Sequence, residues 1–331
     1  MQDYDFVRSS LRLMQRWTPD AIKVSANKFM PAWLPTGEVL NAPPFARPAI
    51  APQPTTLPAT LGRLGALEVR LAQTRKDIKR AQRLRYNVFY KDGSAIADAK
   101  TMLARRDKDA FDKICDHLLV IDHDARLPLD GPGAFKRKPP VVGTYRLLGQ
   151  EAADRHGGFY TESEFDVAAL IERHRDLRFL ELGRSCVLPP YRNKRTVELL
   201  WHGIWSYVRR HHFDVMIGCA SLEGTDPDRL ASQLAFLHHY AAAPAEWRAA
   251  AHGTRRVEMN RLPKEAINPK AALHELPPLL KGYLRIGAFI GDGAVIDYQF
   301  GTTDVLVVMP VSAINRRYIQ HFGADAQRHA A

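Results

Sequence analysis

The stretch LELGRSCVLPPYRNKRTVELLW, from Leu180 to Trp201, decides how the chain folds. It begins like a strand, turns at Pro189 and Pro190, passes polar and basic residues, and then has apolar residues at helical spacing. A strand, a turn and a helix in this order often bind phosphate, because backbone N–H groups at the helix start point at the anion. Such turns usually carry glycines, and this one has none. The turn therefore predicts an anionic partner held by side chains.

The composition also predicts an anionic partner. The 331 residues carry a net charge of +11, with a pI of about 9.6, and 46% are hydrophobic, which is enough for a substantial core. The basic residues are spread along the chain without a recognition motif, so we expect no nucleic-acid binding. There is no apolar run near the roughly 20 residues of a membrane span and no secretory signal. The cysteines lack CxxC spacing, which indicates a reducing, cytoplasmic location: Cys115, Cys186 and Cys219.

Residues 1–60 are expected to form an N-terminal appendage. The segment FVRSSLRLMQRW places Arg8, Arg12 and Arg16 on one stripe of a helix beside an apolar stripe. A basic amphipathic helix of this kind can lie on an anionic membrane surface, and the alternative is that it packs on the core. The proline-rich residues 41–60 that follow are typical of a linker. We therefore expect an amphipathic arm and a linker before the folded domain.

The folded domain is expected to span residues 61–325. Alternation and buried apolar runs predict strands, and period 3.6 predicts one helix that starts at the N-cap Thr74 and a second over 196–212. A helical insertion is expected around 226–278, followed by a last αβ portion. The predicted strands are 67–72, 117–122, 141–148, 178–188 and 213–221. The order strand, helix, three strands, helix, strand predicts a mixed α/β sheet around a central strand–turn–helix.

These segments resemble known proteins. The arrangement is similar to the GNAT N-acyltransferase fold, and LRYNVFY, FDKICDHLLV, GTYRLL and ELGRSCV are similar to the acyl-homoserine-lactone synthases. Longer segments resemble the ornithine N-acyltransferase family of ornithine-lipid synthesis over about residues 65–323: ELGRSCVLPPYRNKRTVELLWHGIWSYV, CASLEGTDP, LHHY and PPLLKGYLRIGAFIGDGAVIDYQFGTTDVLVVMPV. The resemblance implies a mostly antiparallel central sheet flanked by helices. It also implies transfer of a 3-hydroxyacyl chain from acyl carrier protein to the α-amine of L-ornithine, which gives lyso-ornithine lipid.

The turn distinguishes between two acyl donors. GNAT turns usually read (Gln/Arg)-x-x-Gly-x-(Gly/Ala), and in that frame Arg195 and Val197 fill the two small-residue positions. Side chains there obstruct the close backbone approach that the pyrophosphate of coenzyme A needs. Acyl carrier protein presents one phosphodiester on an acidic surface, for which side-chain cations are enough. We expect its phosphopantetheine to be a co-substrate, with no separate cofactor, and we expect it to contact Arg192, Asn193, Lys194, Arg195 and Thr196.

Aminolysis of a thioester requires a neutral amine, a proton acceptor and a donor to the developing oxyanion. Glu181 is the candidate base, because burial in an apolar strand makes a carboxylate more basic. Arg184 would face the other side of the strand unless Gly183 marks a bulge, so we assign it the separate role of orienting the site. The fold implies an oxyanion donor at the backbone of Cys186 or Val187. Nothing in the sequence supplies a base for Cys186, which is expected to be a buried structural thiol.

Resemblance to the lactone synthases implies an acceptor cleft formed around Arg85, Phe89, Asp112, Asp116, Arg146 and Glu181. Ornithine carries a carboxylate and two amines. Arg146 is the candidate partner for the carboxylate, and Asp112 or Asp116 for the side-chain ammonium. The alternative for Arg85 and Asp116 is a structural ion pair that fixes the N-terminal helix.

Two other functions also fit parts of the sequence. The first is a lactone-type synthase with another amino-acid-derived amine, and the second is a membrane-bound docking module for acyl carrier protein. His117 and Asp122 fit the H-x4-D pattern of glycerolipid O-acyltransferases, but strand alternation points them to opposite faces. The adjacent histidine pairs at 211–212 and 238–239 are poorly spaced for one ion, so no metal is expected. The sequence thus predicts an acyltransferase, peripheral on the inner face of the cytoplasmic membrane.

Overall fold

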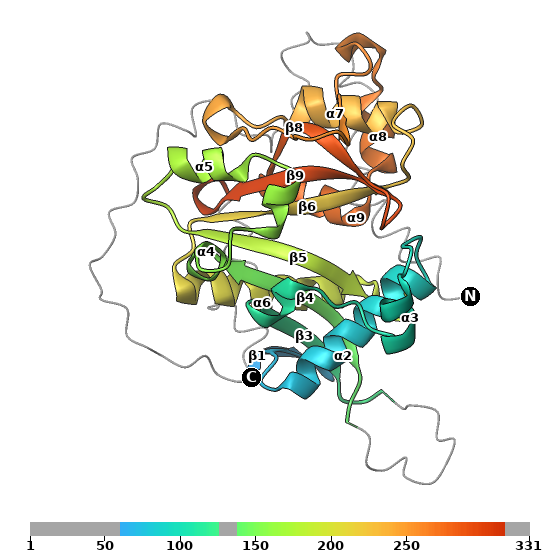
Figure 1. Ribbon diagram of the computed structural model, residues 1–331, viewed down its shortest axis with the longest axis vertical. Coiled ribbons are helices and arrows are strands. Elements are labelled where there is room, and N and C mark those ends of the chain that lie inside the picture. The colour runs from blue at the N-terminus through green and yellow to red at the C-terminus, as the bar shows by residue number, and fades with distance from the viewer. Residues whose placement is uncertain (1–59, 126–137, 315–331) are drawn as a thin grey trace. The chain divides into compact units, whose positions relative to one another are not determined.

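The computed structural model describes residues 60–125 and 138–314, and within these ranges nine strands form one sheet (Figure 1). The strands follow the order β1-β2-β3-β4-β5-β6-β9-β8-β7 across the sheet. The predicted amphipathic arm and nearly all of the linker lie outside the described residues. The strands are β1 (Thr60–Leu64), β2 (Leu67–Leu71), β3 (Asp116–Asp122), β4 (Val141–Gly149), β5 (Phe179–Val187), β6 (Val215–Glu223), β7 (Arg256–Val257), β8 (Phe289–Asp297) and β9 (Thr302–Pro310).

Every neighbouring pair in this sheet is antiparallel except β5 and β6. These two are parallel because the long helix α6 (Lys194–His211) returns the chain from the end of β5 to the start of β6. The predicted fold class, a mixed and mostly antiparallel sheet flanked by helices, is confirmed.

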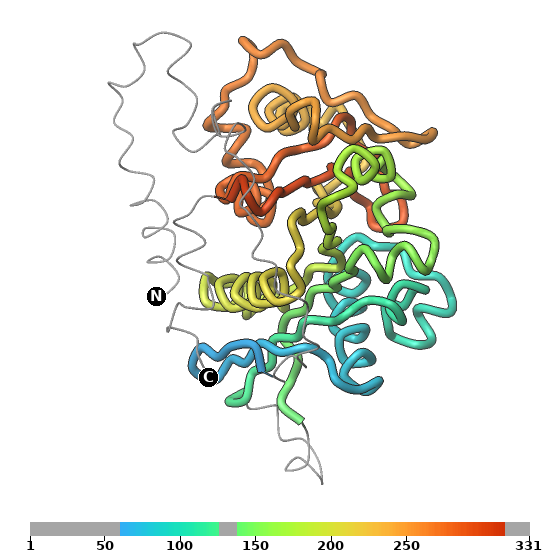
Figure 2. Tube along the Cα trace, turned by 90° about the vertical axis from the view of Figure 1, so that its left-hand side faces the viewer, coloured from blue at the N-terminus to red at the C-terminus, as the bar shows by residue number. Residues whose placement is uncertain are grey.

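Two helices cover opposite faces of the N-terminal strands, as Figure 2 shows from the side. Helix α2 (Arg75–Tyr86) starts at the predicted N-cap, where the Thr74 hydroxyl accepts the N–H of Asp77. It packs on Leu119 and Ile121 of β3. On the other face, Gly203 of α6 lies against Leu118, where a Cβ would come within 3.1 Å of that side chain. Residues 118 and 119 therefore face different helices, as the period of two in a strand requires.

The shorter helices lie between and after these elements. They are α3 (Ala99–Ala104), α4 (Gln150–Asp154), α5 (Val167–Arg173), α7 (Ala231–Ala241), α8 (Pro269–Glu275) and α9 (Pro278–Ile286). A π-helical turn, Asn87–Lys91, follows α2 directly. Between β6 and α9 the chain forms α7, a 3₁₀ turn, the short strand β7, a second 3₁₀ turn and α8, in that order. Strand β1 was not predicted, because the proline-rich segment that leads into residues 60–64 resembles a linker up to its end.

The sheet opens between β5 and β6, and this opening positions the site. The two strands pair at only three positions, the last of which joins Glu181 to Ile217. Gly218 follows, and a Cβ there would lie 2.3 Å from the carbonyl oxygen of Leu182, so only glycine permits this approach. Beyond it, β6 continues along β9 while β5 continues along β4. The second half of β5 is therefore free of pairing with β6.

Across residues 60–125 and 138–314, no helix is both long and apolar enough to span a bilayer.

Candidate active site

A bulge in β5 brings Glu181 and Arg184 to the same side of the sheet. The register between β4 and β5 shifts between Thr144 and Arg146, and Arg184 has a left-handed φ of 47°. A non-glycine residue held in that region costs about 1–3 kcal/mol, and such strain is concentrated at functional sites. Both side chains contact the Tyr160 segment, so the placement of the two on opposite faces does not hold. The bulge that the sequence allowed for at Gly183 is present at Arg184.

Glu181 is a buried carboxylate held by one turn of backbone. Its side chain accepts the N–H of Tyr160 at 3.1 Å and the N–H of Thr161 at 2.7 Å, as well as the Thr161 hydroxyl. Only 4% of the residue is exposed. Burial raises the pKa of Glu181 above 4.5, and the hydrogen bonds from Thr161 oppose this rise. The carboxylate is therefore fixed in orientation and made more basic, as expected from its apolar strand.

A second buried carboxylate lies close to the first. The Cys219 thiol of β6 donates to Glu164 at 3.5 Å and lies 4.0 Å from the Thr161 hydroxyl, which in turn donates to Glu181. Burial, with the charge of nearby Asp304, raises the pKa of Glu164 to about 7. Two carboxylates of raised pKa thus lie on either side of a hydroxyl and a thiol, each of which donates its proton to its own carboxylate.

Glu164, Cys219 and Asp304 offer three ligand atoms within 4.8 Å of one another. A metal would require the thiolate of Cys219. Burial and the two neighbouring carboxylates instead raise the pKa of that thiol well above its ordinary value. These groups would therefore have to lose their protons for a metal to bind.

Three arginines and three aspartates form a buried network beside Glu181. Arg85 is 1% exposed and binds Asp107 at 2.7 Å and Asp112 at 2.8 Å. Arg146 is 3% exposed and donates to both oxygens of Asp109. Arg146 and Asp112 also lie 3.6 Å apart. The charges in this network are balanced, and Arg146, the predicted carboxylate partner, already has a carboxylate of its own.

Arg184 is the most accessible arginine of this network. Its guanidinium lies between the rings of Tyr160 and Phe300, at 4.8 Å from each centroid, and 15% of the side chain is exposed. It approaches Asp107 and Asp109 at 3.5 Å, which is long for an ion pair. Aromatic stacking positions the guanidinium, and its edge faces Asp107 through Nε and Asp109 through Nη2.

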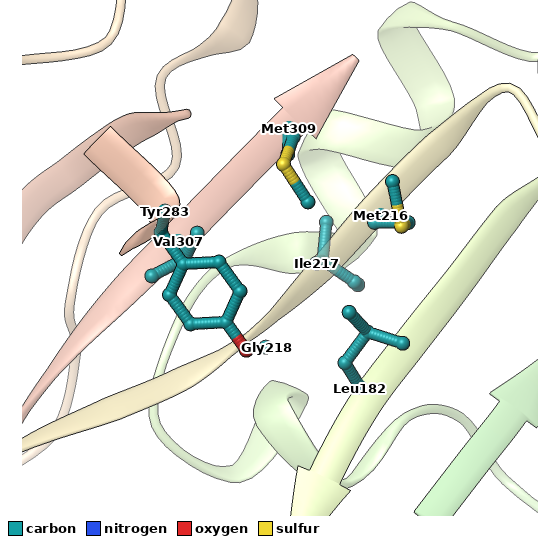
Figure 3. A pocket seen from close by; sticks show the side chains of 7 residues that line it. All are labelled: Leu182, Met216, Ile217, Gly218, Tyr283, Val307 and Met309. Carbon is teal, nitrogen blue, oxygen red and sulfur yellow. The ribbon is translucent and has the colours of Figure 1, made fainter. Parts of the chain in front are cut away.

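A backbone N–H group and a small cavity both lie at the opening between β5 and β6. Leu188 donates its N–H to Val142 of β4, so alternation points the N–H of Val187 away from β4 and toward the opening. Figure 3 shows the cavity, which has a volume of about 10 Å³, enough for about one water molecule. Its lining is almost wholly apolar: Leu182, Met216, Ile217, Gly218, Tyr283, Val307 and Met309.

The basic turn after β5 is exposed. Arg192, Lys194 and Arg195 all lie on the surface at the start of α6, where the helix dipole adds partial positive charge. Asn193 is the N-cap and accepts the N–H of Thr196 at 3.1 Å. Thr196 itself is fully buried. The structure thus brings the three cations together and leaves Thr196 out of the surface they form.

The other predicted residues lie in different surroundings. Phe89 packs edge-on against Phe300 at 5.7 Å and so lies beside the Arg184 sandwich. Asp116 accepts a hydrogen bond from Tyr207 of α6, on the opposite face of the sheet from α2, and does not pair with Arg85. Cys186 packs among α2 residues, and burial raises its pKa to about 12, which fits a structural thiol.

His117 and Asp122 have separate partners. His117 contacts the backbone oxygen of Asp112, and Asp122 accepts from Tyr191. The two residues therefore do not form the paired site of a glycerolipid O-acyltransferase.

Several residues of the site carried no signal in the sequence. Asp107 and Asp109 lie in a polar loop, and Tyr160, Thr161 and Glu164 lie in another polar loop 17 to 21 residues before Glu181. Nothing in the local pattern distinguishes them from solvated loop residues, because their partners come from distant strands.

Comparisons with known proteins find relatives of the chain that contains this site. The model of the acetyltransferase (GNAT) domain matches residues 84–202, which include β5 and the basic turn. L-ornithine N(alpha)-acyltransferase of Agrobacterium fabrum is 51% identical over 81% of this chain and 88% of its own length. The protein of the same name from Brucella abortus is 52% identical over 81% of this chain and 92% of its own length.

Among solved structures, a CoA-dependent acyl-homoserine lactone synthase, MesI, is 13% identical, with a TM-score of 0.38. The match covers 78% of this chain and 94% of that one.

Proposed function

Because this chain belongs to the L-ornithine N(alpha)-acyltransferase family, we propose that it acylates the α-amine of L-ornithine. The proposed donor is a 3-hydroxyacyl chain on acyl carrier protein, and the proposed product is lyso-ornithine lipid. The observation that carries the proposal is the position of Glu181, a fixed and buried carboxylate at the last paired position before β5 and β6 separate.

In the proposed reaction, the neutral α-amine attacks the thioester carbonyl carbon. The nitrogen forms a C–N bond and loses a proton, and the C–S bond breaks to release the pantetheine thiolate, which takes up that proton and leaves as the thiol. Glu181 accepts the amine proton through a bridging water, because its two oxygens already accept hydrogen bonds and little of it is exposed. The N–H of Val187, directed toward the opening, donates to the developing oxyanion.

A second buried carboxylate of raised pKa lies near Glu181. Thr161 donates its hydroxyl proton to Glu181, and Cys219, whose sulfur lies 4.0 Å from that hydroxyl, donates to Glu164. Burial raises the pKa of Glu164 to about 7, so this group binds and releases a proton near the working pH. A base poised near the working pH is the most effective kind.

The acceptor site that we propose differs from the one expected from the sequence. Arg184 replaces Arg146 as the partner of the ornithine carboxylate. Arg146 has 3% of its side chain exposed and contacts Asp109 closely, whereas Arg184 has 15% exposed and contacts Asp107 and Asp109 only at 3.5 Å. Asp109, whose side chain is 25% exposed, replaces Asp112 as the partner of the side-chain ammonium. Asp116 lies on the other face of the sheet and is left out.

The α-amine has an advantage in this reaction. Model α-amino groups titrate about two units below a lysine-type amine, so roughly a hundredfold more of the α-amine is neutral near pH 7. This difference favours N-alpha over side-chain acylation even before the site orients the substrate.

The proposed donor binds in two parts. The exposed cations Arg192, Lys194 and Arg195 would hold the phosphodiester and the acidic surface of acyl carrier protein. The apolar cavity at the opening marks the path of the acyl chain, and the flexible side chains of Met216 and Met309 would move aside to admit it.

The test is an assay of the purified full chain with 3-hydroxyacyl carrier protein and L-ornithine, scored by mass spectrometry. Matched reactions contain the same acyl chain on coenzyme A, or L-lysine or putrescine in place of ornithine. We expect N-alpha-acylornithine, formed faster from the carrier protein than from coenzyme A, and little product from putrescine, which lacks a carboxylate. Acylation of the δ-amine, or of putrescine as fast as ornithine, would contradict the proposed acceptor site.

A further inference from the structure

Five large apolar side chains are exposed in residues 60–125 and 138–314, and four of them lie on α3, just before α3, or in the turn between β8 and β9. Ile96 is 70% exposed, Met102 59%, Leu103 90% and Tyr298 62%. Val197, at 46%, lies apart from them on α6. We call the four residues Ile96, Met102, Leu103 and Tyr298 the α3 patch.

The α3 patch is built from two segments that are joined to each other. Ile96 donates its N–H to the carbonyl of Gln299 at 2.7 Å, and Ser94 donates to the carbonyl of Phe300 at 2.9 Å. The turn between β8 and β9 and the segment leading into α3 therefore form one surface. Helix α3 has no buried residue, so its apolar side chains do not pack in the core formed by residues 60–125 and 138–314.

The surroundings of the patch are basic. Residues 91–108 include five basic side chains that are not buried, namely Lys91, Lys100, Arg105, Arg106 and Lys108. The two exposed acidic side chains in this range are Asp92 and Asp98, and Asp98 is occupied as the N-cap of α3. Exposed aliphatic residues surrounded by cations are typical of a segment that rests on an anionic lipid surface.

We propose that the α3 patch is a membrane contact, in which Met102 and Leu103 enter the headgroup region of an anionic bilayer and the flanking cations bind lipid phosphates. A bilayer fits this patch better than a protein does, because four apolar side chains are far fewer than the roughly 20–30 residues on each side of a stable protein interface. A lipid surface needs only a few inserted side chains, with charge attraction around them.

The position of the patch connects it to the candidate site. Phe300, two residues after Tyr298, stacks on Arg184. A bilayer that covers the patch would therefore lie next to the acceptor side of the site. If the proposed function holds, the acylated ornithine would pass from the site directly into the bilayer; this part of the inference rests on the proposed function. Membrane binding itself needs no catalysis, so its failure would leave the proposed function untouched.

The test uses full-length protein that carries an environment-sensitive fluorophore on Leu103→Cys, and Val197→Cys as the matched control on another exposed apolar position. Cys115 and Cys186 are buried and Cys219 is half-buried, so unsubstituted protein labelled in parallel gives the background. Vesicles of mixed phosphatidylglycerol and phosphatidylcholine are expected to shift the emission at position 103 to the blue and to leave position 197 unchanged. Vesicles of phosphatidylcholine alone should have a much smaller effect.

Sedimentation of unlabelled protein gives an independent measurement. We expect Met102→Ser with Leu103→Ser to reduce the partition onto anionic vesicles about tenfold, in keeping with two aliphatic side chains that enter only part of the way. Val197→Ser should bind as the unsubstituted protein does. Three results would overturn the proposal: an absent shift at position 103, an equal shift at both positions, or a shift caused by acyl carrier protein instead of vesicles.

Discussion

The buried residues around β5 and the exposed turn that follows it both contain charged side chains, but the first are buried and the second face solvent. We call the buried residues around β5 the interior. Around the interior of β5, Glu181 and Arg146 are almost fully buried and bonded to fixed partners. In the turn, Lys194 keeps 76% of its side chain exposed and has only a surface pair with Glu198. Buried, paired charges determine the geometry of a site and the protonation of its groups, whereas exposed charges determine how fast a second protein associates with the surface. We therefore expect mutations in the interior to change stability and turnover, and mutations in the turn to change donor binding.

The largest effect is expected from Arg85→Met. The substitution leaves Asp107 and Asp112 buried without their main cation, and removal of one partner from a buried pair costs about 3–5 kcal/mol. Urea unfolding at pH 7 measures the loss. The exposed Arg195→Met serves as the control and should change stability by no more than about 0.5 kcal/mol. An equal loss of unfolding free energy in the two variants would show that the buried charges contribute no more to stability than those of the turn.

The pH dependence of stability should depend on Glu164. Its folded-state pKa, about 7, lies above 4.5, so between these values the native state binds more protons than the unfolded state. The free energy of unfolding should therefore fall as the pH rises through this window, by up to about 3 kcal/mol. Glu164→Gln should make this part of the curve less steep, with the raised pKa of Glu181 contributing the slope that remains, and the exposed Glu223→Gln should leave it unchanged. An unchanged slope in Glu164→Gln would show that other groups cause it.

The strand opening should depend on Gly218. A methyl group at this position meets the carbonyl of Leu182, so Gly218→Ala should push β6 away from β5 and destabilise the fold by about 1–3 kcal/mol. Gly282 of α9 has no atom within 4 Å of its would-be Cβ, and Gly282→Ala is the matched control, with an unchanged or slightly higher melting temperature. Calorimetry on both variants compares them. Equal melting temperatures would mean that the close approach is not required.

The smallest effect is expected in the turn. Lys194→Glu with Arg195→Glu should raise the KM for acyl carrier protein about tenfold, leave kcat unchanged and reduce the salt dependence of kcat/KM. Arg192 is retained because it also donates to the carbonyl of Val187. The same charge change on α2, Lys76→Glu with Lys79→Glu, controls for net charge. If the α2 variant raises the KM equally, the effect is a property of overall charge and the turn is not the docking site.

Features of the structure that depend on residues close together in the chain could be predicted from the sequence. Thr74 as an N-cap, the strand–turn–helix around the proline pair and the burial of Glu181 all follow from local patterns, and the structure contains each of them. A carboxylate in the run FLELG is buried because its strand lies in the middle of the sheet.

The remainder of the site depends on residues that are distant in sequence. Whether Arg146 is free or saturated depends on Asp109, 37 residues earlier, which a strand pattern does not reveal. The bulge at Arg184 depends on the register with β4, and the partners of Glu181 come from a loop with no regular period. A sequence pattern can name the reactive residue type, but the choice among nearby charges requires the tertiary contacts.

The most direct test of the account is kcat as a function of pH for the unsubstituted protein and Glu181→Gln, with saturating acyl carrier protein and ornithine. Burial raises the pKa of Glu181, so the acid side of the unsubstituted profile should include the titration of this group. Glu181→Gln should lower kcat by roughly a hundredfold or more and lose that contribution, with an unchanged circular dichroism spectrum. A Glu181→Gln protein with nearly the original kcat and the same profile would contradict the account and make Glu181 a structural residue.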